Sequence, residues 1–425
     1  MDSRQSEPST GLSFSTIRQK YEIQSEDLDV LVQGRSIIDT QVGLSGVHLR
    51  SLEDVDRFAQ SYGYDLSNPI EKAEVLGNFH EAISFVRKYF LQPENPDGIK
   101  HDIPRKILEL SDVRDLFLMS NLAYINQVED TQGVYLRNWA CSLLKVMHTI
   151  AHIDKDLRAS YFVDIQKQIF DRFYKVIHRD DQGKLYLGES VSDPLRVDLV
   201  SFETKPKKAR ESILLKLLHK PENVAEDIFD RVGIRFVTQS RFDAFRVVKY
   251  LKDSLIIVSA NIKPSRSRNT LMDLKALKTE VHAAIPLLES GALKEEQFLA
   301  KLEDVPTPSQ NSKNENQHTS EDYKALQFTC RQLIKFKNPV FEDVKELKAL
   351  SKTKTIPEEV ARVIERIEPK YLQREVRFFY PFEVQITDRK SAEENDKGRS
   401  AHSEYKRMQI QTALKRVMGG LLDEG

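Results

Sequence analysis

The sequence predicts an α+β protein in which a helical N-terminal domain precedes a domain that mixes strands and helices. Up to about residue 178, apolar residues recur every three or four positions, as they do on one face of a helix. Beyond that point, short runs alternate with a period of two, which is typical of half-buried strands. The length of 425 residues exceeds one ordinary core and indicates two or three domains.

Composition favours a globular protein in a reducing compartment. Apolar residues make up 40% and charged residues 30% of the chain, and the net charge is -1, so any basic surface must be local. The two cysteines, Cys141 and Cys330, exclude a disulfide framework. We find neither a signal peptide nor an apolar run long enough to cross a bilayer, and we therefore expect a cytoplasmic protein with no membrane association.

The N-terminal half divides into a polar segment, 1–13, which we expect to be disordered, and a helical domain, 14–190. Ser51 and Asp54 fit a capping box that begins one helix, and Asn68 before Pro69 fits the start of the next. That second helix carries one continuous apolar stripe: Leu76, Phe79, Ile83, Val86 and Phe90. Further helices are expected at 138–154 and 162–173.

The second domain, 191–425, is expected to combine strands with helices. Strands are predicted at 195–199, 233–238 and 255–260, and helices at 212–218 and 242–251. Two stretches, 266–320 and 338–374, are interpreted as insertions. The first ends in 306–320, which has no apolar residue and is expected to be a flexible loop, whereas 338–374 is expected to be helical and charged.

Three blocks of the second domain, taken together and in order, resemble the RelA/SpoT alarmone synthetases. The first has Ser-Ile-x-x-Lys at 212–216 and Asp-x-x-Gly-Ile-Arg at 230–235. The second is Asp-Tyr-Lys-Ala-Leu-Gln-Phe-Thr at 322–329. The third has Glu-Val-Gln-Ile at 383–386 and then Ala-His-Ser-Glu-Tyr-Lys at 401–406. The resemblance implies a nucleotidyltransferase domain with a mixed β-sheet flanked by helices.

The family assigns roles to the matching residues. By resemblance, Asp230 and Glu383 would bind Mg²⁺ and activate a hydroxyl group, and the donor nucleotide would be ATP. Lys208, Lys216 and Arg235 would contact that ATP. The acceptor would be a guanine nucleotide, held by the last three site residues: Tyr323, Gln385 and His402. These residue types suit pyrophosphate transfer, which needs a cation on the phosphates, fixed positive charge around them and an oriented acceptor.

Departures from the family leave alternatives open. Pro206 replaces an expected arginine, and Gln327 replaces an expected histidine. A nucleotide-binding regulatory module without turnover, or transfer to the 3′ end of a tRNA, therefore remains an alternative to alarmone synthesis. Without the resemblance, Asp230 would be interpreted as a turn cap and Glu383 as a solvent-facing residue. His148 and His152, one helical turn apart, could bind a metal ion but are more simply core or surface histidines.

Overall fold

The chain forms two compact units. The computed structural model describes residues 36–39, 49–121, 131–205, 209–220, 231–308, 323–353, 356–367, 373–397 and 402–422. One unit, the helical unit, comprises 1–156, 210–227 and 407–425. The other, the sheet unit, comprises 157–209 and 228–406. The expected disorder of 1–13 concerns residues outside the described ranges.

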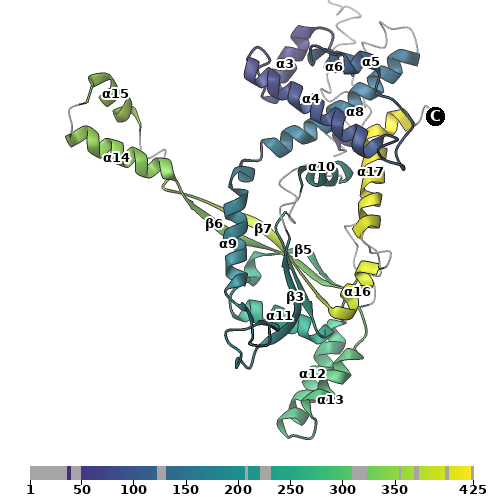
Figure 1. Ribbon diagram of the computed structural model, residues 1–425, viewed down its shortest axis with the longest axis vertical. Coiled ribbons are helices and arrows are strands. Elements are labelled where there is room, and N and C mark those ends of the chain that lie inside the picture. Colours follow the sequence, from purple (N-terminus) through teal and green to yellow (C-terminus); the bar gives the residue numbers. More distant parts are fainter. Residues whose placement is uncertain are drawn as a thin grey trace, which may run out of the picture. The chain divides into compact units, whose positions relative to one another are not determined.

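The helical unit is built from six α-helices of the described chain and the end of a seventh (Figure 1). They are α3 (Leu52–Tyr62), α4 (Pro69–Phe90), α5 (Arg105–Leu108), α6 (Arg114–Met119), α8 (Thr131–Asp154), α10 (Arg210–His219) and the later part of α17 (His402–Leu422), with a 3₁₀ turn, η1 (Ile37–Asp39). None of the helices within these described ranges is long and apolar enough to cross a membrane.

Local sequence signals determine where two of these helices begin. Ser51 accepts a hydrogen bond from the backbone of Asp54, and the Asp54 carboxylate accepts one from the backbone of Ser51, so the predicted capping box is confirmed. The Asn68 side chain caps α4 in the predicted way. The apolar stripe of α4 is buried at Phe79, Val86 and Phe90. It packs against α8, whose Trp139 is fully buried.

A small apolar pocket of about 50 Å³ lies among the helices of this unit, and His148 is on its wall. The ring nitrogen Nδ1 of His148 lies 2.7 Å from the hydroxyl of Tyr62, and the ring of His152 is 4.5 Å away, centroid to centroid. Burial, together with the neighbouring His152, lowers the pKa of His148 to about 4. His148 is therefore neutral at pH 7.

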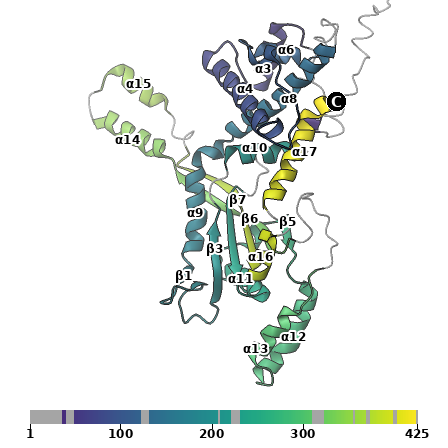
Figure 2. The ribbon, with the colours of Figure 1, turned by 45° about the vertical axis from the view of Figure 1, so that its right-hand side comes forward.

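The sheet unit contains a seven-stranded mixed sheet in the order β1-β2-β3-β4-β7-β6-β5 (Figure 2). The strands are β1 (Ile177–Arg179), β2 (Leu185–Leu187), β3 (Val197–Thr204), β4 (Gly233–Thr238), β5 (Ile262–Asn269), β6 (Leu326–Lys337) and β7 (Glu375–Asp388). β4 and β7 pair in parallel, and every other neighbouring pair is antiparallel. The α+β class is thus confirmed.

Two helices cover the apolar face of this sheet: α9 (Phe162–Tyr174) and α11 (Arg241–Asp253). Phe173 of α9 contacts both Phe236 of β4 and Phe382 of β7, with ring centroids 6.2 and 5.9 Å away. Because side chains alternate along a strand, the residues between these aromatics point to the opposite face. Burial of one face therefore determines which residues the other face presents.

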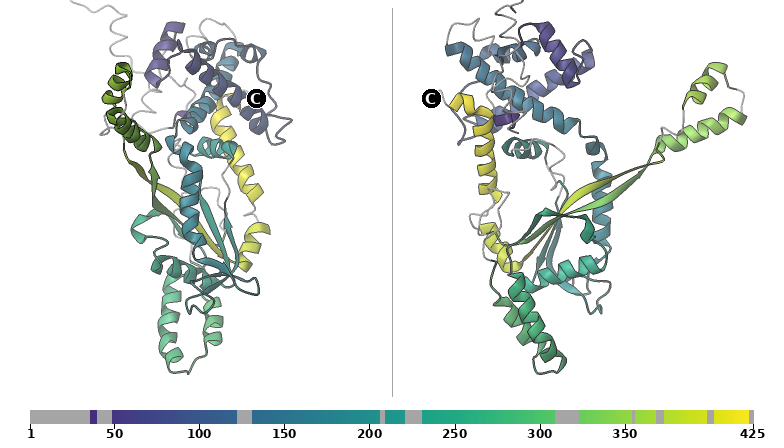
Figure 3. Two further views of the ribbon diagram at one scale, coloured as in Figure 1. Left: turned by 60° about the vertical axis from the view of Figure 1, so that its left-hand side comes forward. Right: turned by 180° about the vertical axis from the view of Figure 1, so that it is seen from behind.

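The remaining helices of the sheet unit lie in the two expected insertions and after β7. α12 (Leu274–Glu289) and α13 (Glu295–Glu303) follow β5. The ends of β6 and β7 extend as a two-stranded ribbon, and α14 (Pro339–Thr353) and α15 (Glu358–Arg366) lie at its tip (Figure 3). α16 (Arg389–Lys397) follows β7, and short 3₁₀ turns, η2 (Leu157–Tyr161) and η4 (Ser259–Asn261), complete the unit. The loop expected to be flexible falls largely outside the described residues.

The structure differs from the sequence prediction in which segments belong to each unit and in one strand. Residues 157–190 belong with the sheet, not with the helical domain expected to extend to residue 190, because α9 buries its apolar face against the strands. Conversely, α10 and 407–425 join the helical unit. The prediction of a strand at 255–260 is wrong. Leu255 has a φ of 54°, which turns the chain, and the strand begins only at Ile262.

The pKa of His148 predicts an acid-sensitive helical unit. Its pKa lies near 6.5 in the unfolded chain and near 4 in the folded one, so protons bind the unfolded state preferentially. The contribution of His148 leaves the free energy of unfolding unchanged above pH 6.5 and lowers it as the pH drops from 6.5 to 4. The total decrease is about 3 kcal/mol, since one pKa unit corresponds to about 1.4 kcal/mol.

Urea unfolding followed by the fluorescence of Trp139, the only tryptophan, measures this effect. His148→Gln stays neutral at every pH, so the difference between wild type and variant should change by about 3 kcal/mol from pH 7.5 to pH 4. His80→Gln, at an exposed position of α4, controls for the loss of an imidazole. A difference that is constant over this pH range would show that His148 does not titrate in this way.

Candidate functional site

Five strands bring polar residues into one row on the face of the sheet opposite α9 and α11. Arg235 of β4 lies directly opposite Gln385 of β7, which lies opposite Gln327 of β6. The row ends at Glu203 on β3 and Arg268 on β5. We call these five residues the polar row. Its two arginines are three strand spacings apart, or about 14 Å between their Cα atoms.

Glu383 lies beside this row, two residues before Gln385 and on the same face. Its Oε2 is 3.2 Å from the ammonium nitrogen of Lys205, and its Oε1 accepts a hydrogen bond of 2.5 Å from the amide of Gln327. The Glu383 side chain is only 12% exposed, so both contacts form in a partly desolvated setting where charge interactions are strengthened. Both oxygens of the carboxylate are therefore engaged.

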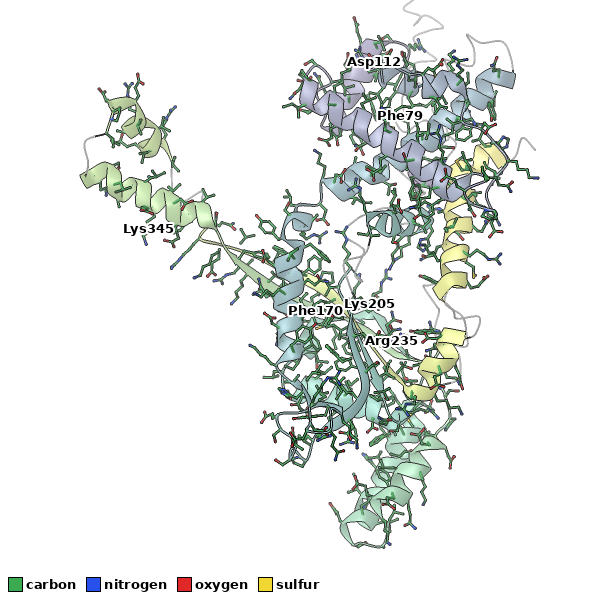
Figure 4. The ribbon with its side chains drawn as sticks, in the orientation of Figure 1. Phe79, Asp112, Phe170, Lys205, Arg235 and Lys345 are labelled. Atoms are coloured by element: carbon green, nitrogen blue, oxygen red, sulfur yellow. The ribbon has the colours of Figure 1, made fainter. Side chains whose placement is uncertain are left out.

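Gly233 makes the approach of Lys205 possible. The backbone N–H of Lys205 donates to the carbonyl of Gly233 at 2.8 Å, and the lysine side chain then crosses over the glycine. A Cβ at this position would lie 2.6 Å from the Cδ of Lys205, closer than atoms approach in real structures. Glycine is thus required here for space, since it lets the lysine reach Glu383. Figure 4 labels Lys205, the residue that follows the end of β3, and Arg235 of β4.

Arg235 and Arg268 supply cationic groups with spare donors. The Nε atoms of both are buried and have no hydrogen-bond partner within the described residues. Arg235 also lies 3.9 Å from the exposed Asp396 of α16, a contact too long to be a hydrogen bond. Burial lowers the pKa of Arg268, but an arginine stays charged at any ordinary pH. Two partly buried guanidinium groups with unused N–H donors are well suited to bind an anion.

Tyr323 lies near both arginines and is held by its backbone. Its carbonyl accepts a hydrogen bond of 2.8 Å from Thr270, and the next residue, Lys324, exchanges hydrogen bonds with the buried Asn395 of α16. Burial raises the pKa of Tyr323 to about 12. The charges of Arg235 and Arg268 oppose this rise, whereas that of Glu383 adds to it. The phenol is therefore neutral and belongs to the same electrostatic site as Glu383.

Four of the eight site residues predicted from the sequence come together here: Arg235, Tyr323, Glu383 and Gln385. Lys216 lies on α10, which belongs to the helical unit. His402 begins α17, and its side chain lies outside the described part of the chain. The remaining two, Lys208 and Asp230, are also outside the described residues.

The described donor set is compatible with a Mg²⁺ ion held mainly by phosphates. Mg²⁺ is often bound by one or two carboxylates together with substrate phosphates and water. Glu383 supplies one carboxylate at the site, and its present cationic neighbour is the Lys205 ammonium group. Within the described ranges, no group of three or more His, Cys, Asp or Glu side chains is arranged to hold a metal ion, and this includes the surroundings of His148.

Sequence reasoning missed Lys205, Arg268 and Gln327 as members of the site. Gln327 stood out only as a departure from the family pattern, yet it holds Glu383 directly. Arg268 lies in a basic stretch, 263–268, that could not be aligned with the family. No local pattern points to Arg268, because residues 263–268 contain no apolar residue that could show an alternation, and only the pairing of β5 with β6 places it in the row.

Comparisons with protein families, with curated proteins and with solved structures found no match to this chain. The site is therefore interpreted from its own geometry.

The contact between Lys205 and Glu383 should depend on Gly233. In a double-mutant cycle, Lys205→Met and Glu383→Gln should show a coupling of about 1 kcal/mol in the free energy of unfolding, because the two groups are partly buried and adjacent. In a Gly233→Ala background the coupling should fall close to zero, since the new methyl group displaces the lysine.

Urea unfolding followed by circular dichroism measures the free energy of unfolding of the eight proteins of this cycle, which include the wild type. Gly77→Ala is the control background, since a Cβ there would meet no other atom within 4 Å. An equal coupling in the Gly233→Ala background would mean that the lysine reaches Glu383 by another path.

Proposed function

We propose that the sheet unit is a Mg²⁺-dependent transferase of the nucleotide pyrophosphokinase type, which moves pyrophosphate from ATP to a guanine nucleotide. The observation that carries this proposal is the convergence of Glu383, Arg235, Arg268 and Tyr323 on one face of the sheet. A carboxylate beside two guanidinium groups with unused donors is the arrangement that phosphoryl transfer needs. The order of the sequence blocks that resemble RelA/SpoT synthetases also supports it.

Each residue has a definite part in the proposed reaction. Arg235 and Arg268 hold the phosphates of the donor, and their separation of about 14 Å suits a nucleotide that carries several phosphates. Tyr323 offers an aromatic face for the purine of the acceptor, and Gln385 offers an amide for its polar edge. Mg²⁺, when bound, would neutralise charge on the transferred phosphates.

The bond changes are those of a pyrophosphate transfer. The acceptor hydroxyl oxygen attacks the β-phosphorus of ATP, and a new oxygen–phosphorus bond forms. The bond between the β-phosphorus and the oxygen that bridges to the α-phosphorus breaks, and AMP leaves. The Glu383 carboxylate receives the proton of the hydroxyl group. This role requires Lys205 to leave Glu383 and move towards the phosphates, where a lysine serves as a point charge.

A second candidate function, nucleotide binding without turnover, is favoured by one specific contact. Both oxygens of Glu383 are engaged, one by Lys205 and one by Gln327. These contacts would have to break before the carboxylate could reach an acceptor hydroxyl group. In that case the site would sense nucleotide and would regulate a partner of unknown identity through the helical unit.

Turnover tests the transferase proposal. The wild type, given γ-labelled ATP and Mg²⁺ with GDP, GTP or tRNA as acceptor, should form a labelled product. Glu383→Gln should lower the rate by at least about 100-fold, because it removes the proton acceptor at nearly constant shape. Asp230→Asn is expected to act similarly. Glu280→Gln, an exposed position on α12, is the matched control. A Glu383→Gln variant with a wild-type rate would rule out this mechanism.

Nucleotide affinity distinguishes the two candidates from a protein with no nucleotide site. Arg268→Met should weaken ATP binding at least about tenfold, because a charge-assisted contact to phosphate contributes roughly 1.5–3 kcal/mol. Lys275→Met, on the exposed side of α12, should leave affinity unchanged. Isothermal titration calorimetry measures the ATP affinity of both variants. Binding without any labelled product would support the silent module, and no binding by a folded wild type would exclude both functions.

A further inference from the structure

The ribbon formed by the outer halves of β6 and β7 has one face packed and one face exposed. On β6 the odd-numbered residues from Arg331 to Lys337 are exposed, whereas Ile334 between them is fully buried. Residues of η2 and α9 cover the even-numbered side, where Tyr161 stacks on Phe336 and Arg172 reaches Gln332. The odd-numbered side thus remains uncovered by the described part of the sheet unit.

This exposed face is basic and carries an aromatic ring. We call it the basic strip, and its members are Arg331, Leu333, Lys335 and Lys337 on β6 with Arg377 and Phe379 on β7. Phe379 is 52% exposed, and Leu333, directly opposite it, is 38% exposed. The one carboxylate in these registers, Glu375, pairs with Arg377. Within the described residues, the ion pairs include none that involves Arg331, Lys335 or Lys337.

The basic strip continues directly into the candidate site. Side chains separated by two residues on a strand share a face, so Arg331 leads to Thr329 and then to Gln327 of the polar row. On β7 the same parity leads from Arg377 and Phe379 through Pro381 to Glu383. The strip is therefore aligned with Glu383, with the buried Thr329 and Pro381 between them on the same face.

We propose that the basic strip binds a single-stranded polynucleotide whose end enters the candidate site. Unpaired lysines and arginines along a track attract a phosphate backbone, and an exposed aromatic ring among them gives a base a surface to stack on. An acidic peptide would satisfy the cations but would leave Phe379 without a matching group. The placement of the strand's end, and hence its use as acceptor, rests on the proposed transferase function, whereas binding to the strip does not.

Fluorescence anisotropy with labelled single-stranded RNA and DNA of equal sequence tests this proposal on the full chain. Wild type should bind, with an affinity that falls with salt at a log–log slope of about −2, as expected for about three phosphate contacts. The double variant Lys335→Glu and Lys337→Glu should bind at least about tenfold more weakly. Phe379→Leu keeps an apolar group opposite Leu333 but removes the ring, and should weaken binding at least about fivefold.

Two controls separate this proposal from its alternatives. Lys278→Glu, at an exposed position of α12, changes charge by as much as one strip substitution and should leave affinity unchanged. Polyglutamate should compete poorly. Failure of RNA and DNA alike to bind, or equal binding by the strip variants and wild type, would overturn the proposal. Binding of polyglutamate with higher affinity than either nucleic acid would overturn it in favour of an acidic protein partner.

The readouts also separate failure of this proposal from failure of the proposed function. Oligonucleotide binding without transfer to any acceptor would leave the strip proposal standing and reject the transferase. Transfer to GDP or GTP by wild type and strip variants alike, without oligonucleotide binding, would reject the strip proposal and leave the transferase proposal standing.

Discussion

β4 and β7 run parallel in the middle of the sheet, and their register determines which side chains meet on each face. Gly233 lies opposite Glu383 and Arg235 lies opposite Gln385, whereas Ile234 and Val384 turn to the core. A slip of one residue would move Arg235 or Glu383 into contact with α9 and α11 and would expose apolar side chains. Burial of the aromatic core therefore determines the register, and the register places the site residues together on the opposite face.

Polar groups on the other face are stabilised by contacts with one another. Gln385 is 8% exposed and Thr329 is 3% exposed, so neither group is fully hydrated. Burying such groups is costly unless they find hydrogen-bond partners. Gln327 and Lys205 provide these for Glu383, whereas Arg235 and Arg268 keep unused donors. This contrast explains why we assign the phosphates first to the two arginines, and to Lys205 only after it has left Glu383.

The sequence alone predicted the local elements well where one signal dominated. The capping box at Ser51 and the stripe of α4 needed only neighbouring residues, and both are confirmed. The strand expected at 255–260 failed because its apolar residues, such as Ile257, enter the core from a turn. Domain membership was harder still, because α9 is amphipathic, as α3 of the helical unit also is, and its partner, the sheet, lies far along the chain.

The site could be predicted only in part for a similar reason. Arg235, Tyr323, Glu383 and Gln385 were reached through short blocks that resemble a family, and the structure brings these four together. Lys205 and Arg268 join them through pairing across five strands, which no local pattern reveals. Gly233 is a clear case, since its importance depends on the path of a lysine that precedes it by 28 positions.

The interleaved order of the two units also constrains how the protein is made. The last helix, α17, contributes Leu414, Val417 and Leu421 to the interior of the helical unit. Its carbonyl groups accept hydrogen bonds from α8: Asn138 donates to Gly420 at 2.8 Å and Ser142 to Val417 at 3.0 Å. During synthesis the first 156 residues therefore emerge without the helix that closes their core. The sheet unit can therefore complete itself first, and the first-made segment becomes native only after α17 has been synthesised.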